Sequence, residues 1–284
     1  MELKSYGLTD QGDRPNNEDT FLTNDRLGAY LLCDGMGGPA GGDFASFFAS
    51  RQVMDTLVKA SEMQISKKKI SGEETLDPYP DDAKQDTPES YLEYAVWQTN
   101  QQFHRVAAKK ANDGQKMGTT LVGFWFLKDK IWSLNVGDSR AYGLWDNHLF
   151  RLTRDDCWVE EQILMGQIDP EEAHRYRSKI TKAVGTNPYV NPQINSHPIP
   201  YSGGRFLLCS DGFYDHVPSD EIAKLMPLSN LEEAAKKMIE KAVELGKAKQ
   251  AEKKVKVRDN ITVLVIDLKM YGIARPEEDT LNFE

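Results

Sequence analysis

The sequence predicts an α+β fold in which antiparallel sheets and helices form separate layers. Segments that alternate apolar and polar residues recur in pairs joined by tight turns, which is the pattern of β-hairpins. Helical periodicity occurs in separate blocks between these pairs, without the strict strand–helix alternation of a parallel sheet. Most strands are therefore expected to pair with their neighbours along the chain.

The first half of the chain is expected to hold one hairpin and two long helices. TFLT and AYLLC flank the turn sequence NDRLG and predict a hairpin over residues 20–34. A helix begins near Gly41–Asp43, and a second one spans about residues 89–111, directly after Pro88. Residues 61–88 are rich in lysine, acids and proline and are interpreted as a polar, solvated insertion. The apolar face of the first helix is expected to carry Phe44, Phe47, Phe48, Met54 and Val58.

The second half is expected to be rich in strands. Residues 118–152 predict two further hairpins, the second with its turn at Asp146-Asn147. Residues 157–177 have a polar, helical pattern, and RFLLC and ITVLVIDL are expected to be buried strands. Residues 271–284 form a polar tail. A late helix is expected to bury Leu231, Ala234, Ala235, Met238, Ala242 and Leu245.

Composition argues against several classes of protein. Hydrophobic residues at 39% and charged residues at 28% are typical of a globular protein, and the net charge of −9 argues against nucleic-acid binding. Three widely spaced cysteines form neither a disulfide framework nor a zinc motif, which favours a reducing cytosol. MELKSYGLTD lacks the apolar region of a signal peptide, and no apolar run reaches the ~18 residues of a membrane span. We therefore expect a cytoplasmic protein that does not bind membranes.

Two apolar segments end in nearly the same residues, LLCDGMGG at 31–38 and LLCSDG at 207–212. The first formally fits the G-x-G-x-x-A pattern of a dinucleotide-binding turn. However, the helix after it leads into the lysine-rich insertion instead of a second parallel strand, and no Gly-Lys-Ser/Thr of a phosphate-binding loop follows. A tight strand-to-helix turn without chemistry is the other reading, and it stays open for this stretch taken alone.

Acidic residues recur in similar settings, at strand ends or in tight loops. An aspartate at the end of a buried strand is costly to desolvate unless a positive charge compensates it. Several of them on strands that share a sheet indicate carboxylates that converge on hard cations, and oxygen ligands favour Mg²⁺ or Mn²⁺ over zinc. Adjacent glycines would let a backbone carbonyl approach the metal. The residues concerned are Glu18, Asp19, Asp34, Asp138, Asp211 and Asp259.

Six motifs are spread along the chain: GDRPNNED (12–19), CDGMGGPAGGDFAS (33–46), MGTT (117–120), VGDSRAY (136–142), LLCSDGF (207–213) and RDNITVLV (258–265). In this order and spacing they resemble the metal-dependent protein serine/threonine phosphatases of the PP2C (PPM) family, and the DGMGG form is similar to bacterial members. The resemblance implies an αββα sandwich of two antiparallel β-sheets flanked by helices, with a single phosphatase domain over residues 1–270.

The resemblance also implies which residues hold the two catalytic Mn²⁺ or Mg²⁺ ions. Asp34 would bridge them, and Gly35 would offer its backbone carbonyl to one ion. Glu18, Asp211 and Asp259 would hold the other ion, directly or through water. A water bridging the two metals would attack the phosphorus of phosphoserine or phosphothreonine directly, so that no covalent protein nucleophile is needed.

Three further residues receive supporting roles from the same resemblance. Asp19 would orient a metal-bound water, and Asp138 together with Asp211 matches a third, weaker metal position. Arg14 matches the phosphate-binding arginine of the family, whose planar fork suits two phosphoryl oxygens. The mobile flap of the family corresponds to residues 154–187, where substrate selection is expected.

The sequence departs from the family pattern near the expected site. Met36 and Pro39 occupy positions where many members carry histidine, and Asp156-Cys157 replaces the usual His-Ser. The five histidines match no motif position and are read as surface or turn residues, so metal-bound water is expected to protonate the leaving group. Cys33 and Cys209 end apolar strands and are read as small core residues.

Other functions were weighed against this one. A pseudophosphatase that binds phosphoproteins would be expected to lack part of the metal set, which is complete here, and hydrolysis of a small phosphorylated molecule would use the same site. A dinucleotide-dependent oxidoreductase is the most distant alternative. The expected partners are phosphorylated Ser/Thr proteins, with the enzyme acting as a monomer and opposing a Ser/Thr kinase.

Overall fold

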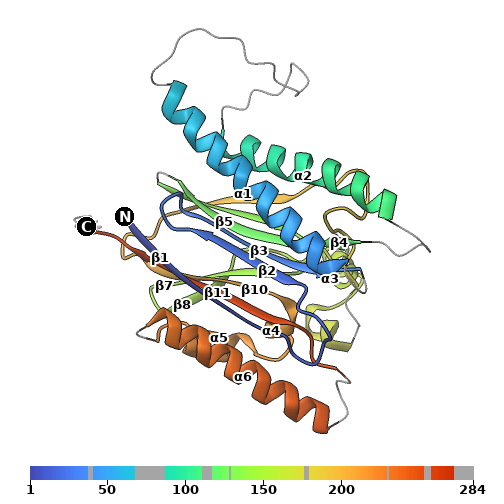
Figure 1. The fold of residues 1–284 in the computed structure, drawn as a ribbon. Coiled ribbons are helices and arrows are strands. Elements are labelled where there is room, and N and C mark those ends of the chain that lie inside the picture. The colour runs from blue at the N-terminus through green and yellow to red at the C-terminus, as the bar shows by residue number, and fades with distance from the viewer. Residues whose placement is uncertain are drawn as a thin grey trace.

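Two antiparallel β-sheets lie face to face, and helices cover the outer face of each (Figure 1). The computed structural model describes residues 1–37, 41–67, 87–110, 117–127, 129–175, 179–228, 230–252 and 257–271. The four layers confirm the predicted αββα sandwich. None of the helices in these ranges has the length and apolar composition that a membrane span requires.

The first sheet has five strands in the order β1-β11-β10-β7-β8. Strands β1 (Glu2–Asp10) and β11 (Ile261–Lys269) pair along nine residues, so the two ends of the described chain lie together. The predicted turn between β7 and β8 is confirmed, because Asp146 and Asn147 both have positive φ values of 49° and 62°, as a two-residue hairpin turn requires. The remaining bounds are β10 (Gly204–Cys209), β7 (Arg140–Trp145) and β8 (His148–Arg151).

The second sheet has the order β2-β3-β5-β6-β9. Strands β2 (Asp19–Asn24) and β3 (Ala29–Met36) form the first predicted hairpin, and a short strand β4 (Gly118–Thr119) pairs with the end of β3. The sheet is completed by β5 (Leu121–Leu127), β6 (Lys130–Val136) and β9 (Gln193–Pro198).

Long helices cover both sheets. Helices α1 (Gly42–Lys67) and α2 (Pro88–Lys110) pack on the six-stranded sheet, whereas α5 (Ser219–Leu225) and α6 (Leu231–Ala251) pack on the five-stranded one. The predicted α2 is confirmed and begins one residue earlier than expected, and the predicted late helix is α6, which buries Ala234, Ala235, Met238 and Ala242. Shorter elements are α3 (Trp158–Leu164), the 3₁₀ turn η1 (Pro170–Arg175) and α4 (Asp211–Tyr214).

Three predictions need correction. Helix α1 includes residues 61–67, which had been assigned to the insertion, while residues 68–86 of the insertion lie outside the described residues. Phe47 is 51% exposed because α1 faces β3 with smaller side chains, including Ala45, Ala49, Val53 and Leu57. The polar helix over 157–177 is two short elements, because Gly166 adopts a φ of +68°. Pro39 and residues 272–284 of the tail are also outside the described ranges.

The core between the sheets is strongly aromatic. Phe124, Phe126 and Phe206 pack edge to face or tilted, with ring centroids 5.1–5.8 Å apart. Phe124 and Phe126 are each 2% exposed or less, while Trp125, which is 1% exposed, packs in the cluster that the sheet forms with α1 and α2. Because both sheets are fixed against this core, the positions of their strand ends relative to one another are fixed as well.

Candidate metal centre

Acidic residues from both sheets meet at one end of the sandwich. Asp34, near the end of β3, lies opposite Asp19 in the β2–β3 register. Asp211 begins α4 directly after β10, and Asp259 lies two residues before β11. In Figure 1, β4 and α4 lie toward the same end of the two sheets. The fold therefore brings together carboxylates that are up to 240 positions apart in the sequence, between Asp19 and Asp259.

Asp19 is held by hydroxyl groups of the opposite sheet. Its Oδ2 accepts hydrogen bonds from Ser210 Oγ at 2.8 Å and Thr262 Oγ1 at 2.6 Å. Its other oxygen, Oδ1, is buried and has no hydrogen-bond partner in the described part of the chain. Burial raises the pKa of Asp19 to about 6, against the two hydroxyl bonds, which favour its charged form. Asp19 therefore has one fixed oxygen and one oxygen available to a further group.

The backbone around Asp34 is fixed by the MGTT motif. The Asp34 amide donates to Thr120 Oγ1 at 2.9 Å, and the Asp34 carbonyl accepts from the Thr120 amide and from Thr119 Oγ1, each at 2.9 Å. Burial raises the pKa of the Asp34 carboxyl well above its usual value, and the negative charges of Asp19 and Asp211 raise it further. A cation beside this carboxylate would favour its charged form and lower its pKa again.

Glycines at 35 and 42 allow three chain segments to meet without side chains between them. A Cβ atom on Gly35 would lie 2.0 Å from the Gly42 carbonyl oxygen and 2.7 Å from that of Glu18. A Cβ on Gly42 would lie 2.6 Å from the Glu18 carboxyl carbon. The Gly35 amide also donates to the Glu18 carbonyl at 3.1 Å. Burial and the nearby charge of Asp43 raise the pKa of Glu18. The glycines after Asp34 thus serve close packing around Glu18.

A second group of acids surrounds the start of α4. Asp211 Oδ1 is buried without a hydrogen-bond partner among the described residues, and its pKa is raised by burial and then by the charges of Asp138 and Asp215. Burial, followed by the charge of Asp155, raises the pKa of Asp138 to about 7. The carbonyl of Asp138 accepts a hydrogen bond from Tyr214 Oη at 2.9 Å. The third position that the sequence suggested is therefore occupied by three mutually repelling carboxylates.

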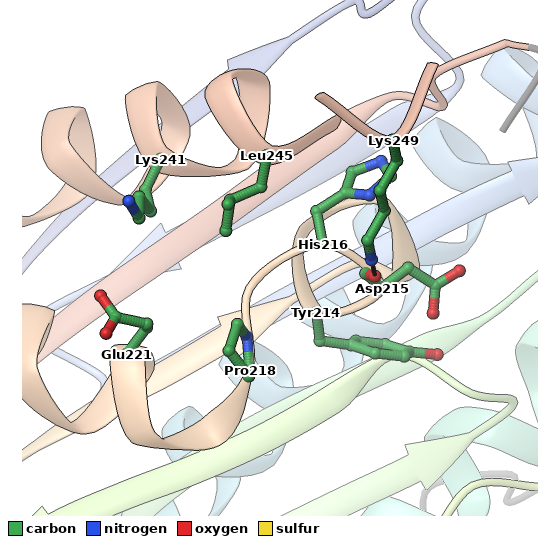
Figure 2. A pocket seen from close by; sticks show the side chains of 8 residues that line it. All are labelled: Tyr214, Asp215, His216, Pro218, Glu221, Lys241, Leu245 and Lys249. Carbon is green, nitrogen blue, oxygen red and sulfur yellow. Dashed lines mark hydrogen bonds between the residues drawn. The ribbon is translucent and has the colours of Figure 1, made fainter. Parts of the chain in front are cut away.

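Asp215 was not predicted from the sequence. Figure 2 shows its carboxylate on the same side as the Tyr214 hydroxyl and directed away from Lys241 and Leu245. It is four residues after Asp211, and this spacing places both residues on one face of a helical turn. That spacing was the signal that could have identified it.

The loop that carries Arg14 is fastened to the segment before β11. Arg14 Nη2 donates to Asp259 Oδ2 at 2.6 Å, and the Arg14 side chain remains 49% exposed. Asn260 donates to the carbonyls of Gln11 and Asn16 and accepts from the Glu18 amide at 2.9 Å. Arg14 is thus next to a predicted metal ligand, with half of its guanidinium side chain open to solvent.

Two cysteines, one histidine and three neutral polar side chains pack around the carboxylates. Cys33 and Cys209 are fully buried, as expected, and burial raises the pKa of both thiols. His216 lies in the turn after α4, is only 7% exposed and lines the cleft drawn in Figure 2. Ser210, Thr262 and Asn260 hold the site together and were not singled out by the sequence, since neutral side chains at these positions carry no distinctive spacing.

The carboxylates fit a cation site in their chemistry but do not form a finished set of ligands. Among the described residues, no three Asp, Glu, His or Cys side chains are close enough to hold a metal ion together. Two buried carboxylate oxygens without partners and six acids with raised pKa values nevertheless share this end of the sandwich. All of these groups are hard oxygen donors, which suit Mg²⁺ or Mn²⁺. The residues present therefore fit divalent cations.

The four-layer sandwich and the carboxylates at one of its ends are the features expected of a metal-dependent enzyme. The family model described as Protein phosphatase 2C matches residues 10–257, and the chain belongs to this family. It is 32% identical over 280 residues to the serine/threonine protein phosphatase PstP of Mycobacterium tuberculosis, covering 98% of this chain and 47% of PstP. The chain thus spans about half the length of that relative.

Two further similarities have fuller coverage. The serine/threonine phosphatase Stp of Listeria welshimeri is 31% identical over 267 residues, which cover 91% of this chain and 93% of Stp. A crystal structure of the catalytic domain of PstP in complex with two manganese ions aligns with a TM-score of 0.70 and 29% identity, covering 95% of this chain and 99% of that domain. These similarities confirm the family that the six motifs predicted.

Proposed function

We propose that this protein is a metal-dependent protein phosphatase that hydrolyses phosphoserine and phosphothreonine monoesters. The observation that carries the proposal is the crowding of buried carboxylates at the end of the sandwich, including the unpartnered oxygens of Asp19 and Asp211. Like charges at such proximity are unfavourable unless cations compensate them. The manganese-bound catalytic domain of PstP, which has the same fold, supports this reading.

The residues that would hold two Mn²⁺ or Mg²⁺ ions are those the motifs indicated. Asp34, the carbonyl of Gly35, Glu18, Asp211 and Asp259 form the proposed set, and Asp138 with Asp211 forms a third, weaker position. We add Asp215 to that third position, because its charge acts on both of its members. Such ions supply Lewis-acid stabilisation of phosphoryl charge and an activated water.

The chain's own groups would position the substrate and the site. Arg14 carries a half-exposed guanidinium that can present its planar fork to two phosphoryl oxygens while its link to Asp259 aligns it. Asp19, with one oxygen fixed by two hydroxyls, would accept a proton or a hydrogen bond through Oδ1. Among the described residues, no histidine forms a hydrogen bond with Arg14 or Asp19, which favours a solvent-derived proton for the leaving serine oxygen.

The experiment is hydrolysis of a phosphothreonine peptide with Mn²⁺, and then with EDTA. Asp34→Asn and Asp211→Asn keep the side-chain shape and remove the charge, and each is expected to lower the rate by roughly 100-fold or more. Asp267→Asn is the matched control, because Asp267 forms a partly buried ion pair with Arg205 away from the site. Turnover that survives EDTA, or Asn variants with the control's rate, would refute the proposal.

The finer features of this function are proposals as well. Residues 1–270 would form one phosphatase domain, active as a cytoplasmic monomer on proteins phosphorylated by a Ser/Thr kinase. A phosphopeptide that binds but is not hydrolysed with Mn²⁺ would indicate a phosphoprotein-binding regulator instead. Faster hydrolysis of small phosphomonoesters than of any phosphopeptide would indicate a small-molecule substrate.

A further inference from the structure

Asp156, one of the departures from the family pattern, contacts the turn that precedes Asp138. Its Oδ2 accepts a hydrogen bond from the Gly137 amide at 3.2 Å, and its own amide donates to the Gly137 carbonyl at 2.8 Å. Both backbone polar groups of Gly137 are therefore bound by one residue. Gly137 has a φ of +105°, and a Cβ there would lie 2.8 Å from Thr120 Cγ2, so the turn has little freedom to adopt another position.

The carboxylate of Asp156 is surrounded by donors alone. Besides the Gly137 amide on Oδ2, Oδ1 accepts from Lys182 Nζ at 2.8 Å and from Gln193 Nε2 at 3.0 Å. The residue is 3% exposed. A carboxylate accepts hydrogen bonds on both oxygens, whereas a neutral histidine accepts on one ring nitrogen and an asparagine on one oxygen. Only an acid can satisfy all three donors. The aspartate that stands here in place of the family's histidine is therefore matched to the nearby Lys182, which donates to it.

Asp156 also lies at the base of the segment corresponding to the flap. Its carbonyl accepts from the Thr181 amide at 2.9 Å, and the Trp158 amide donates to the Lys179 carbonyl at 2.9 Å. Cys157 and Ile180 form an isolated β-bridge between the two arms. The base of this segment and the turn before Asp138 are thus joined through Asp156, by its carboxylate and its amide, and through Asn135, whose side-chain amide donates to the carbonyls of Gly137 at 3.0 Å and Arg154 at 2.9 Å.

We propose that Asp156 is a positioning residue for Asp138, because it holds the Gly137 peptide in place and Lys182 holds its carboxylate there. This inference rests on the proposed function in assigning Asp138 to the weaker metal position. The opposite side of the turn is held by Tyr214, whose hydroxyl donates to the Asp138 carbonyl. Loss of the Asp156 contact frees one side of the turn and weakens metal binding at Asp138 more than at Asp34.

The test uses Asp156→Asn alone and combined with Lys182→Met. In the single variant the amide can place its oxygen toward Gly137 only by turning its NH₂ group toward Lys182 and Gln193, so donors face donors. Removing the Lys182 ammonium relieves most of that conflict and lets the amide oxygen return to the Gly137 amide. The double variant should therefore recover what the single variant loses, which a loss of bulk packing would not do.

Two measurements report on the proposal. Hydrogen exchange of the Gly137 amide, followed by NMR in metal-free protein, should be at least about tenfold faster in Asp156→Asn. The weakest Mn²⁺ affinity measured by calorimetry should fall roughly tenfold, the size typical of losing a group that orients a metal ligand. Both values should return to within about threefold of wild type in the double variant, and Asp267→Asn should alter neither.

The possible outcomes separate this inference from the proposed function. Wild-type exchange at Gly137 in Asp156→Asn, or a double variant no better than the single one, would overturn the positioning role. Equal weakening of every Mn²⁺ site, or the same effect in Asp267→Asn, would overturn it too. Absence of Mn²⁺ binding by the wild-type protein would refute the proposed function, while the exchange data would still decide whether Asp156 fixes the turn.

Discussion

The metal-free protein should lose stability as the pH rises from 5 to 7.5. Burial raises the pKa of Asp19 from 3.8 to about 6 and that of Asp138 from 3.8 to about 7. Between the unfolded and folded values, the folded state holds a proton that the unfolded state has released. The stabilisation that these two protonated carboxyl groups give the fold is therefore fully present below about pH 3.8, and it is lost as the pH rises through their folded pKa values.

The shifts set the size of the effect. One pKa unit corresponds to about 1.4 kcal/mol, so complete titration would destabilise the fold by about 3 kcal/mol through Asp19 and about 4 kcal/mol through Asp138. Part of this loss has already occurred at pH 5, which leaves about 4 kcal/mol from these two groups between pH 5 and 7.5. For a domain of this size, that corresponds to a fall in Tm on the order of 10 °C. The raised pKa values of Asp34 and Asp211 act in the same direction.

Calorimetric unfolding in EDTA at several pH values is the assay, with Asp138→Asn as the comparison. His197 and His216 have lowered pKa values from burial and titrate in the opposite direction in this window. The difference between wild type and variant removes their contribution and reports the Asp138 carboxyl together with its charge effect on Asp211. The salt-bridged Asp13, with its pKa lowered to about 2 by Arg258, loses its contribution only below this window. The variant should show a smaller fall in Tm than the wild type, and saturating Mn²⁺ should raise the wild-type Tm most at pH 7.5. An unchanged pH profile in Asp138→Asn would refute the reasoning.

Two other substitutions test packing and capping. Gly35→Ala would place a methyl group against two backbone carbonyls, so it should destabilise the fold by about 3 kcal/mol and weaken the Mn²⁺ binding measured by calorimetry. Gly166→Ala has open space around it, so it should destabilise the fold by about 1 kcal/mol, from its positive φ alone, and leave Mn²⁺ binding unchanged. Equal effects of the two would argue against close packing at Gly35. Asn230→Ala removes the cap that accepts from the Glu232 and Glu233 amides, and urea unfolding should show a loss of about 1 kcal/mol with unchanged peptide hydrolysis. A catalytic defect in this variant would mean that α6 influences the site.

Local patterns predicted most of the fold. The hairpin turn at Asp146-Asn147 and the apolar periodicity of α6 depend on neighbours in sequence, and both are found in the structure. The exposure of Phe47 could not be predicted in this way, because α1 turns another of its faces, with Ala49, Val53 and Leu57, toward the sheet. Helical periodicity predicts that a helix has an apolar face, but it does not determine which residues are buried against the neighbouring sheet.

Part of the candidate site could likewise be predicted from local sequence, and part of it depends on contacts that only the fold creates. Asp34 and Asp211 could be predicted because a strand end followed by Asp-Gly is distinctive, whereas Glu18, Asp19, Asp138 and Asp259 depended on the resemblance of their motifs to the family. The groups that orient them were missed, since Ser210 and Thr262 reach Asp19 from 191 and 243 positions away. Asp156 was noticed only as a departure, and its role depends on Lys182 and Gln193, which the fold brings to it.

The pairing of β1 with β11 determines where attachments to the protein would project. Asp10 pairs with Ile261 next to the carboxylates, and Glu2 pairs with Lys269 eight residues away at the other end of the same two strands. At ~3.4 Å per residue, the two points are separated by about 27 Å. Residues joined before Glu2 or after Lys269 would thus begin at the end of the sandwich remote from Asp34 (Figure 1). A surface tether or fused module at either position would leave the carboxylate end facing outward, accessible to a large phosphoprotein.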